Sequence, residues 1–305
     1  VYKRQPLYIL FSSGTTGLPK CMVHRAGGVL LQHLKELALH SDLGENQRML
    51  FYTTCGWMMW NWMVSALALG SSLVLYEGSP VFPNAMHLLD IVEETQTHVL
   101  GASAAYFAAL ENANIKGKTI PSLKRILSTG SPLLPQQYDD IFRWLGRTIQ
   151  ICSISGGSDI VSCFALGNPK LPVYKGELQC LGLGMDVAVF NEAGQAVEGE
   201  KGELVCRKPF PSMPLRFWND DGFVKYRESY FEVYPHVWAH GDFAEKTVHG
   251  GLIIYGRSDA TLNPQGIRFG SAELYHVVKR IDGIDDCVAV GQAWKNSERV
   301  LLFIK

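Results

Sequence analysis

The chain has 305 residues, of which 47% are hydrophobic and 19% are charged. This composition predicts a folded protein of about two domains rather than a disordered one. The formal net charge of −1 argues against a nucleic-acid or membrane-surface partner. The sequence has neither a secretory signal pattern nor an apolar run as long as a membrane span, so we expect no membrane span.

The first half of the chain alternates short apolar runs with helical patterns. This alternation is typical of an α/β fold with a mostly parallel sheet. We expect strands at 7–11, 71–76, 98–101, 123–127 and 149–153, and helices at 26–40, 86–94, 104–113 and 136–145. The first strand is expected to be buried. The first helix is expected to have one apolar face, formed by Leu30, Leu34, Leu37 and Ala38.

The pattern changes after residue 171. Short strands at 187–190, 202–207 and 252–255, separated by turns, predict a small antiparallel, barrel-like part. A helix is expected over 271–281. We therefore divide the chain into an α/β sheet part of a large domain (1–171), a β-barrel-like part of that domain (172–257), and a hinge with the start of a small α+β C-terminal domain (258–305).

The glycine- and hydroxyl-rich stretch after the first strand is a candidate phosphate-binding loop. Its glycines allow backbone N–H groups to approach an anion, its hydroxyls add donors, and its lysine adds a compact positive charge. The alternative is an ordinary surface turn. The candidate residues are Ser12, Ser13, Gly14, Thr15, Thr16, Gly17 and Lys20.

A segment rich in tryptophan and methionine, 57–63, can either fill a core or line a pocket. Composition alone favours the core. Three histidines, His24, His33 and His40, raise the question of a metal site, but they have no ligand-like pairing with carboxylates. We expect them to be surface or helix-end residues.

Two further turns follow predicted strands, at the edge of the sheet where open α/β proteins bind ligands. The first contains Gly130, Ser131 and Pro132, and the second contains Gly156, Ser158 and Asp159. The alternative for the second turn is a flexible glycine loop.

Charged residues stand out in the last third of the chain. Asp242 follows a glycine, and a carboxylate is an acceptor that can take two O–H donors, as in a diol. Arg257 and Arg268 flank a motif that leads into the predicted helix, and arginine can bind phosphate through two parallel hydrogen bonds. Alone, this stretch could be a charged surface loop.

Taken together, these motifs resemble those of the adenylate-forming enzymes, which include acyl-CoA synthetases. The most specific matches are Ser-Ser-Gly-Thr-Thr-Gly-Leu-Pro-Lys at 12–20 and Gly-Arg-Ser-Asp at 256–259. The resemblance covers essentially the whole chain. It implies the two-part fold proposed above, with ATP, Mg²⁺ and the co-substrate CoA as ligands. Ser158 and Asp159 stand where the family usually has Thr and Glu.

The resemblance also implies a role for each matched residue. Catalytic roles fall to Lys20, Ser158, Asp159 and Arg268, with Asp159 as the metal ligand. ATP would be bound by Ser12, Ser13, Gly14, Thr15, Thr16, Gly17, Lys20, Gly130, Ser131, Pro132, Ser158, Asp242, Arg257 and Arg268. Trp57 and Gly156 would border the acyl pocket, Gly266 the CoA tunnel, and Asp259 would be the hinge.

Within the family, the resemblance is to the branch that activates acetoacetate. It implies ATP, acetoacetate and CoA as substrates of a cytosolic ligase. Seven scattered cysteines without metal-ligand spacing agree with reduced, mostly buried thiols in that compartment. The alternatives are a ligase for propionate or butyrate and a non-catalytic nucleotide-binding protein. Both ends of the chain look cut, and the family's C-terminal lysine is absent, so we expect a fragment with little or no adenylation activity.

Overall fold

The computed structural model describes residues 5–12, 20–258, 262, 271–278, 280–294 and 297–305. A parallel sheet of five strands forms the centre of the first half, in the order β4-β3-β5-β6-β7. Its strands are β3 (Arg48–Phe51), β4 (Ser72–Leu73), β5 (Val99–Ser103), β6 (Arg125–Thr129) and β7 (Gln150–Ser153). The predicted α/β architecture is therefore confirmed.

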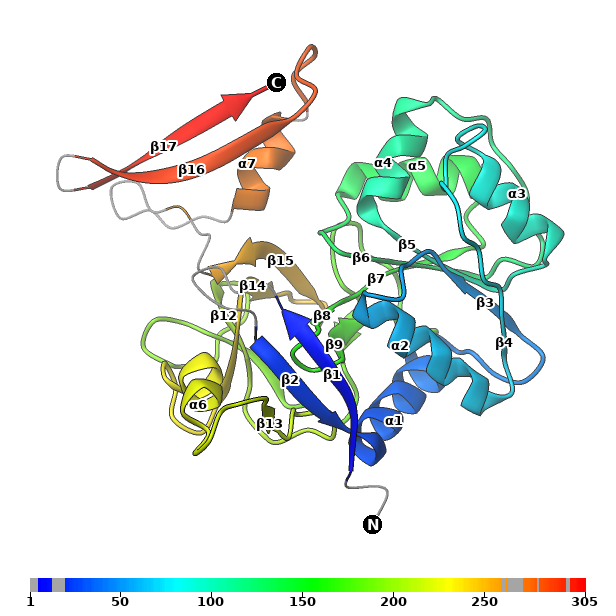
Figure 1. The fold of residues 1–305 in the computed structure, drawn as a ribbon. Coiled ribbons are helices and arrows are strands. Elements are labelled where there is room, and N and C mark those ends of the chain that lie inside the picture. Colours follow the sequence, from blue (N-terminus) through cyan, green and yellow to red (C-terminus); the bar gives the residue numbers. More distant parts are fainter. Residues whose placement is uncertain (1–4, 13–19, 259–261, 263–270, 279, 295–296) are drawn as a thin grey trace.

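Helices cover both faces of this sheet (Figure 1). Alternate residues of a strand point to opposite faces, so Leu100 and Ile126 pack in one core cluster while Val99 and Leu127 pack in another. The first face carries α3 (His87–Glu94), α4 (Ala104–Asn112) and α5 (Pro135–Leu145). The second carries α1 (Ala26–Lys35), the π-helical turn η2 (Glu36–His40), α2 (Met58–Val64) and the 3₁₀ turn η3 (Ser65–Leu69).

Antiparallel sheets pack beside the parallel sheet. One has the order β11-β12-β14-β15, formed by β11 (Val187–Phe190), β12 (Lys201–Cys206), β14 (Trp238–Lys246) and β15 (Leu252–Arg257). A second contains β8 (Ser155–Gly157), β9 (Ser162–Leu166) and β10 (Cys180–Leu181). After the last strand of the parallel sheet, antiparallel pairing starts at β8, before the boundary predicted at residue 172.

The third antiparallel sheet joins strands that are far apart in the sequence. It joins β1 (Pro6–Ser12), β2 (Lys20–Arg25) and β13 (Arg216–Phe217), next to α6 (Val224–Phe231). The C-terminal elements are α7 (Ser271–Val278) and a hairpin of β16 (Cys287–Trp294) and β17 (Ser297–Ile304). Figure 1 shows this hairpin beyond β15, at the opposite side from the parallel sheet.

Two predictions about burial are wrong. Strand β1 is not buried: Leu7 is 48% exposed and Phe11 is 66% exposed. In the first helix Leu30 is exposed, while His33 and Glu36 are completely buried. The apolar pattern correctly predicted a strand and a helix, but hydrophobic periodicity says nothing about which polar side chains find partners in the interior.

Fewer of the cysteines are buried than expected. Cys152, Cys163 and Cys206 are buried, whereas Cys55 is exposed and the other three are intermediate. Among the helices described, none combines the length and apolar character needed to cross a bilayer.

Candidate functional site

The candidate site is a cavity of about 340 Å³ at the carboxyl ends of β6 and β7, closed on its other side by β14 and β15. This is the edge of a parallel sheet at which ligands of open α/β proteins bind. Nine of the residues predicted for the site line this one cavity, although they come from distant parts of the sequence. They are Trp57, Gly130, Ser131, Pro132, Gly156, Ser158, Asp159, Asp242 and Arg257.

The tryptophan- and methionine-rich segment divides between cavity and core. Trp57, at the N-terminus of α2, and the next two residues, Met58 and Met59, line the cavity. One turn further on, Trp62 and Met63 are buried in the core with 0% and 1% exposure. The two interpretations of this segment are therefore both correct, each for one end of α2.

Gly156 lies where strand β8 pairs tightly with β9. A Cβ atom at this position would approach the main-chain oxygen of Ser162 to 2.0 Å. No larger residue fits this backbone without a shift of the hairpin, because a main-chain atom cannot rotate out of the way. The absent side chain thus permits the β8–β9 pairing in this wall of the cavity.

Asp159 lies in the turn after β8 and is the centre of a polar cluster. Its Oδ1 accepts hydrogen bonds from the Tyr230 hydroxyl and from Lys20 Nζ at 3.4 Å. The Lys20 ammonium also lies 4.8 Å from the centre of the Tyr230 ring. The cluster joins β2, the β8–β9 turn and α6.

The surroundings of Asp159 favour its charged form. Burial alone would raise the pKa of this carboxyl group, but the neighbouring His240 ring, the Lys20 ammonium and the Tyr230 hydroxyl outweigh it and lower the pKa below its ordinary value. A carboxylate directed at a cavity next to a lysine has the chemistry to bind a metal-bound polyphosphate.

Asp242 and Arg257 form an ion pair across β14 and β15. Arg257 Nη1 lies 3.1 Å from Asp242 Oδ1 and also donates to the main-chain oxygen of His240 at 3.1 Å. The Asp242 side chain is only 10% exposed, whereas that of Arg257 is 49% exposed. The pair therefore presents a fixed acceptor and an accessible cation to the same cavity.

Gly241, between His240 and Asp242, has a φ of +82°, in the left-handed region. A Cβ atom there would lie 2.5 Å from Arg257 Nη2. Glycine is therefore required both by the backbone and by the arginine. The Gly241 N–H donates to Glu203 Oε1 at 2.7 Å, which holds this turn in place.

Two of the predicted residues lie beside the cavity, and the rest cannot be placed. Ser12 ends β1 and pairs with Lys20, the first residue of β2, so the two strands bring both ends of the glycine-rich loop together. Ser13, Gly14, Thr15, Thr16, Gly17, Asp259, Gly266 and Arg268 lie outside the residues that the structure describes.

Sequence reasoning missed three residues that support the site. Tyr230 binds Asp159, and Glu203 binds the turn before Asp242. His24 donates from Nε2 to the Ser158 main-chain oxygen at 3.2 Å. Tyr230 and His24 had no local motif to identify them, and Glu203 lies within the strand predicted at 202–207, where nothing indicated a role in the site.

The prediction that the three histidines are surface or helix-end residues is wrong in its main part. His24, His33 and His40 are buried, with 0%, 0% and 1% exposure. Each ring donates a hydrogen bond to a main-chain oxygen, of Ser158, Val161 and Gly167 respectively. Burial lowers the pKa of all three, so their neutral forms are favoured.

A magnesium site fits the donors that face the cavity. Among the residues described, no group of three or more His, Cys, Asp or Glu side chains is arranged to hold a metal ion. Magnesium does not need such a group: it commonly keeps several waters and binds one or two carboxylates together with substrate phosphates. Asp159, with its favoured charge and its place in the cavity wall, is suited to be that carboxylate.

The architecture and the site are those of an enzyme that binds a nucleotide at the edge of an α/β sheet. Residues 2–214 match the model of the AMP-binding enzyme family. The chain belongs to this family. Its adenylate-forming fold, with a parallel sheet beside antiparallel sheets, is thereby confirmed.

Individual proteins with known names are also similar to this chain. The chain is 52% identical over 303 residues to acetoacetyl-coenzyme A synthetase of Rhizobium meliloti (strain 1021), covering 98% of this chain and 47% of that protein. It is 52% identical over 307 residues to acetoacetyl-CoA synthetase of Mus musculus, covering 98% and 45%. The solved structure of acetoacetyl-CoA synthetase from Streptomyces lividans has 43% identity and a TM-score of 0.91, covering 98% and 46%. The chain thus spans about half the length of these relatives.

Proposed function

We propose that the natural-length protein containing this chain is an AMP-forming acetoacetate–CoA ligase. The observation that carries the proposal is that one cavity collects the predicted nucleotide-binding residues and the predicted acid-binding residues, in a chain half identical to acetoacetyl-CoA synthetases. Its substrates would be ATP, acetoacetate and CoA. None of the seven cysteines, all of them among the described residues, is in a disulfide, which agrees with the reducing cytosol as its compartment.

ATP would extend along the cavity from the ribose pair to Lys20. Asp242 and Arg257 would bind the ribose hydroxyls, and the Gly130–Pro132 turn would border the adenine. The loop from Ser12 to Lys20 would bind the β- and γ-phosphates through N–H groups, hydroxyls and the ammonium. Ser158 would contact the α-phosphate, and Arg268 would reach the phosphates.

Two half-reactions would follow. In the first, the acetoacetate carboxylate attacks the α-phosphorus of ATP and pyrophosphate leaves, giving an acyl-adenylate. In the second, the CoA thiolate attacks the acyl carbon and AMP leaves. The protein's task in both is to hold charged groups in line and to balance the charge that develops. Magnesium at Asp159 would supply charge neutralisation for the phosphates.

The acid would lie between Trp57 and Gly156. Trp57 provides a flat wall at one end of α2, and Gly156 leaves the opposite wall without a side chain. Such a pocket accommodates an acid longer than acetate. Gly266 would border the path of CoA, and Asp259 would be the hinge between the two half-reactions.

Acid-dependent pyrophosphate release from ATP tests the proposal in the natural-length protein. We expect acetoacetate to be used with a kcat/KM at least about tenfold above that of acetate or butyrate. Equal use of butyrate or propionate would favour the alternative of a general short-chain ligase. Nucleotide binding without pyrophosphate release in the presence of any of these acids would favour a non-catalytic binding protein and contradict the proposal.

A further inference from the structure

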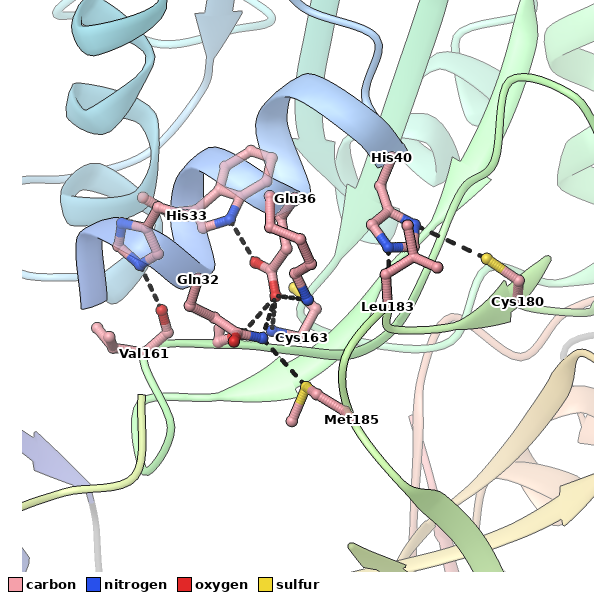
Figure 2. Close-up of polar contacts among 12 residues, drawn as sticks. Gln32, His33, Glu36, His40, Val161, Cys163, Cys180, Leu183 and Met185 are labelled. Atoms are coloured by element: carbon pink, nitrogen blue, oxygen red, sulfur yellow. Dashed lines mark hydrogen bonds and ion pairs between the residues drawn. The ribbon is translucent and has the colours of Figure 1, made fainter. Parts of the chain in front are cut away.

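The buried face of the first helix is polar. Four side chains of α1 and η2 point into the interior, toward the segment that contains β9 (Figure 2). They are Gln32, His33, Glu36 and His40, none of them more than 2% exposed. Each buried polar group needs a hydrogen-bond partner, so the partners of these four side chains show which segments the helix face keeps in position.

Glu36 is the hub of this face. Its Oε1 accepts hydrogen bonds from the Ser162 hydroxyl, from Gln32 Nε2 at 3.0 Å and from the Cys163 N–H at 3.4 Å. Its Oε2 accepts a hydrogen bond from the Trp62 indole N–H at 2.8 Å. The side chain has 0% exposure. The two carboxylate oxygens are therefore held by different elements, Oε1 by β9 and by Gln32 of α1, and Oε2 by α2.

The partners of Glu36 belong to two elements that form walls of the cavity, α2 and β9. Ser162 and Cys163 line it from β9, whereas Trp62 lies one turn beyond Met58 and Met59, which line it from α2. Glu36 itself is absent from the lining. A single carboxylate behind the cavity thus connects the wall on α2 to the wall on β9.

Neighbouring residues of the same face hold β9 along its length. His33 Nε2 donates to the Val161 main-chain oxygen at 2.5 Å, and His40 Nδ1 donates to that of Gly167 at 2.8 Å. His40 Nε2 in turn accepts the Leu183 N–H at 3.1 Å. Figure 2 shows these rings on either side of Glu36, with His33 directed at Val161 and His40 at Leu183 and Cys180. The helix therefore fixes β9 before, at and after the pocket-lining residues.

We propose that Glu36 is a positioning residue that sets the separation of the two walls between which the acid binds. The proposal rests on the proposed function, because it takes the cavity between α2 and β9 as the acid's site. Buried groups that lose a partner must move or remain unsatisfied, so removing one acceptor of Glu36 shifts one wall relative to the other. Of the proposed nucleotide contacts, Asp242 and Arg257 lie on β14 and β15, outside this network. Ser158 and Asp159 lie in the turn before β9, but His24 and Tyr230 hold them independently of Glu36.

Glu36→Gln in the natural-length protein tests this role. The substituted amide keeps the size of the side chain, but its NH₂ group turns a donor toward Trp62 or toward the Ser162 and Cys163 pair. We expect the KM for acetoacetate to rise about tenfold or more, while the KM for ATP changes by less than about twofold. A merely structural role predicts no such division between the two substrates.

The control is Asp140→Asn, the same change of charge on a buried carboxylate that does not line the cavity. Asp140 is 2% exposed and accepts hydrogen bonds from Gln136 and Arg143 within α5. It should leave the acetoacetate KM unchanged. Where Glu36→Gln does not fold, Ser162→Ala removes a single donor to Glu36 and should still raise the acetoacetate KM selectively.

A second measurement does not depend on activity. In protein with ¹³C-labelled methionine methyl groups, Glu36→Gln should shift the Met58 and Met59 resonances, together with the Trp62 indole N–H, and Asp140→Asn should not. Unshifted Met58 and Met59, or equal increases in both KM values, would overturn the proposal. If the unsubstituted protein releases no pyrophosphate with acetoacetate, the proposed function fails, and the methyl shifts still decide whether Glu36 connects the walls.

Discussion

At the scale of single residues, the support of Asp159 by Tyr230 has a measurable energy. Tyr230 donates its hydroxyl to a buried carboxylate, whereas Tyr226, on the same helix, donates to the Pro214 main-chain oxygen at 3.3 Å. Hydrogen bonds to charged groups contribute more than those to neutral groups. Tyr230→Phe should lower the free energy of unfolding by about 2 kcal/mol and Tyr226→Phe by about 1 kcal/mol in urea titrations. Equal losses would show that Asp159 gains nothing particular from Tyr230.

His24 makes stability depend on pH. Burial, the largest cause, lowers the pKa of this ring from 6.5 to about 4. The unfolded chain therefore binds the proton first on acidification, and the stability contributed by His24 is complete above pH 6.5 and lost between pH 6.5 and 4. At pH 5 this loss amounts to about 2 kcal/mol.

His24→Gln should remove this part of the pH dependence, because an amide does not titrate in this range. Urea titrations at pH 7 and pH 5 measure it: the free energy of unfolding should fall less between the two pH values in the variant than in the unsubstituted chain. His33 and His40, whose pKa values are also lowered by burial, keep a slope in both proteins. Identical slopes would contradict a neutral buried His24.

Single residues also show which side chains of the cavity a sequence motif can point to. Asp242 and Arg257 were predicted from motif resemblance, and both line the cavity. Tyr230 and Glu36 were not predicted, because each contacts a partner more than 70 residues away in the sequence. Glu36 also lies on a helix face that the hydrophobic periodicity assigns to the apolar core. A polar residue is recognisable in sequence when it belongs to a motif, and is not recognisable when only the fold supplies its partner.

At the scale of elements, the β8–β9 hairpin limits what can occupy position 156. Gly156→Ala would place a Cβ 2.0 Å from the Ser162 main-chain oxygen, so the strands must separate. We expect a loss of about 1–3 kcal/mol in the free energy of unfolding. Gly44→Ala is the control, since nothing lies within 4 Å of its Cβ position, and it should be close to neutral. A neutral Gly156→Ala would mean that the hairpin pairs more loosely than the structure shows.

The sequence predicted the order of the helices and strands better than it predicted which of their faces are buried. Strand and helix positions of the α/β half were predicted within a few residues, because period and length distinguish them. Strand β2 was missed, since the run from Lys20 to Arg25 carries no strong alternation. Strand β3 of the parallel sheet, helix α2 and the short strands β8 and β9 were missed as well. The outward face of β1 and the polar face of α1 depend on neighbours far along the chain, which local patterns do not contain.

At the scale of the whole molecule, the cavity joins the parallel sheet to the antiparallel sheets. Its walls include Gly130 after β6 and Ser153 at the end of β7, opposite Asp242 on β14 and Arg257 on β15. A ligand in this cavity contacts both parts at once. Binding to the folded chain alone therefore stabilises the two parts together rather than either one separately.

AMP is the simplest probe of this connection. At a free concentration of about 100 times its Kd, it should raise the free energy of unfolding by about 2.7 kcal/mol, in a single transition seen by both tryptophan fluorescence and circular dichroism.

Arg257→Ala removes the accessible cation of the ribose pair, and at the same AMP concentration a tenfold weaker affinity would reduce this gain by about 1.4 kcal/mol. Arg207→Ala is the matched control, because Arg207 pairs with Asp186 outside the cavity lining. If AMP shifted one of two separate transitions, the parts would unfold independently and the cavity would not unite them; if it stabilised Arg257→Ala and Arg207→Ala equally, Arg257 would have no part in holding the nucleotide.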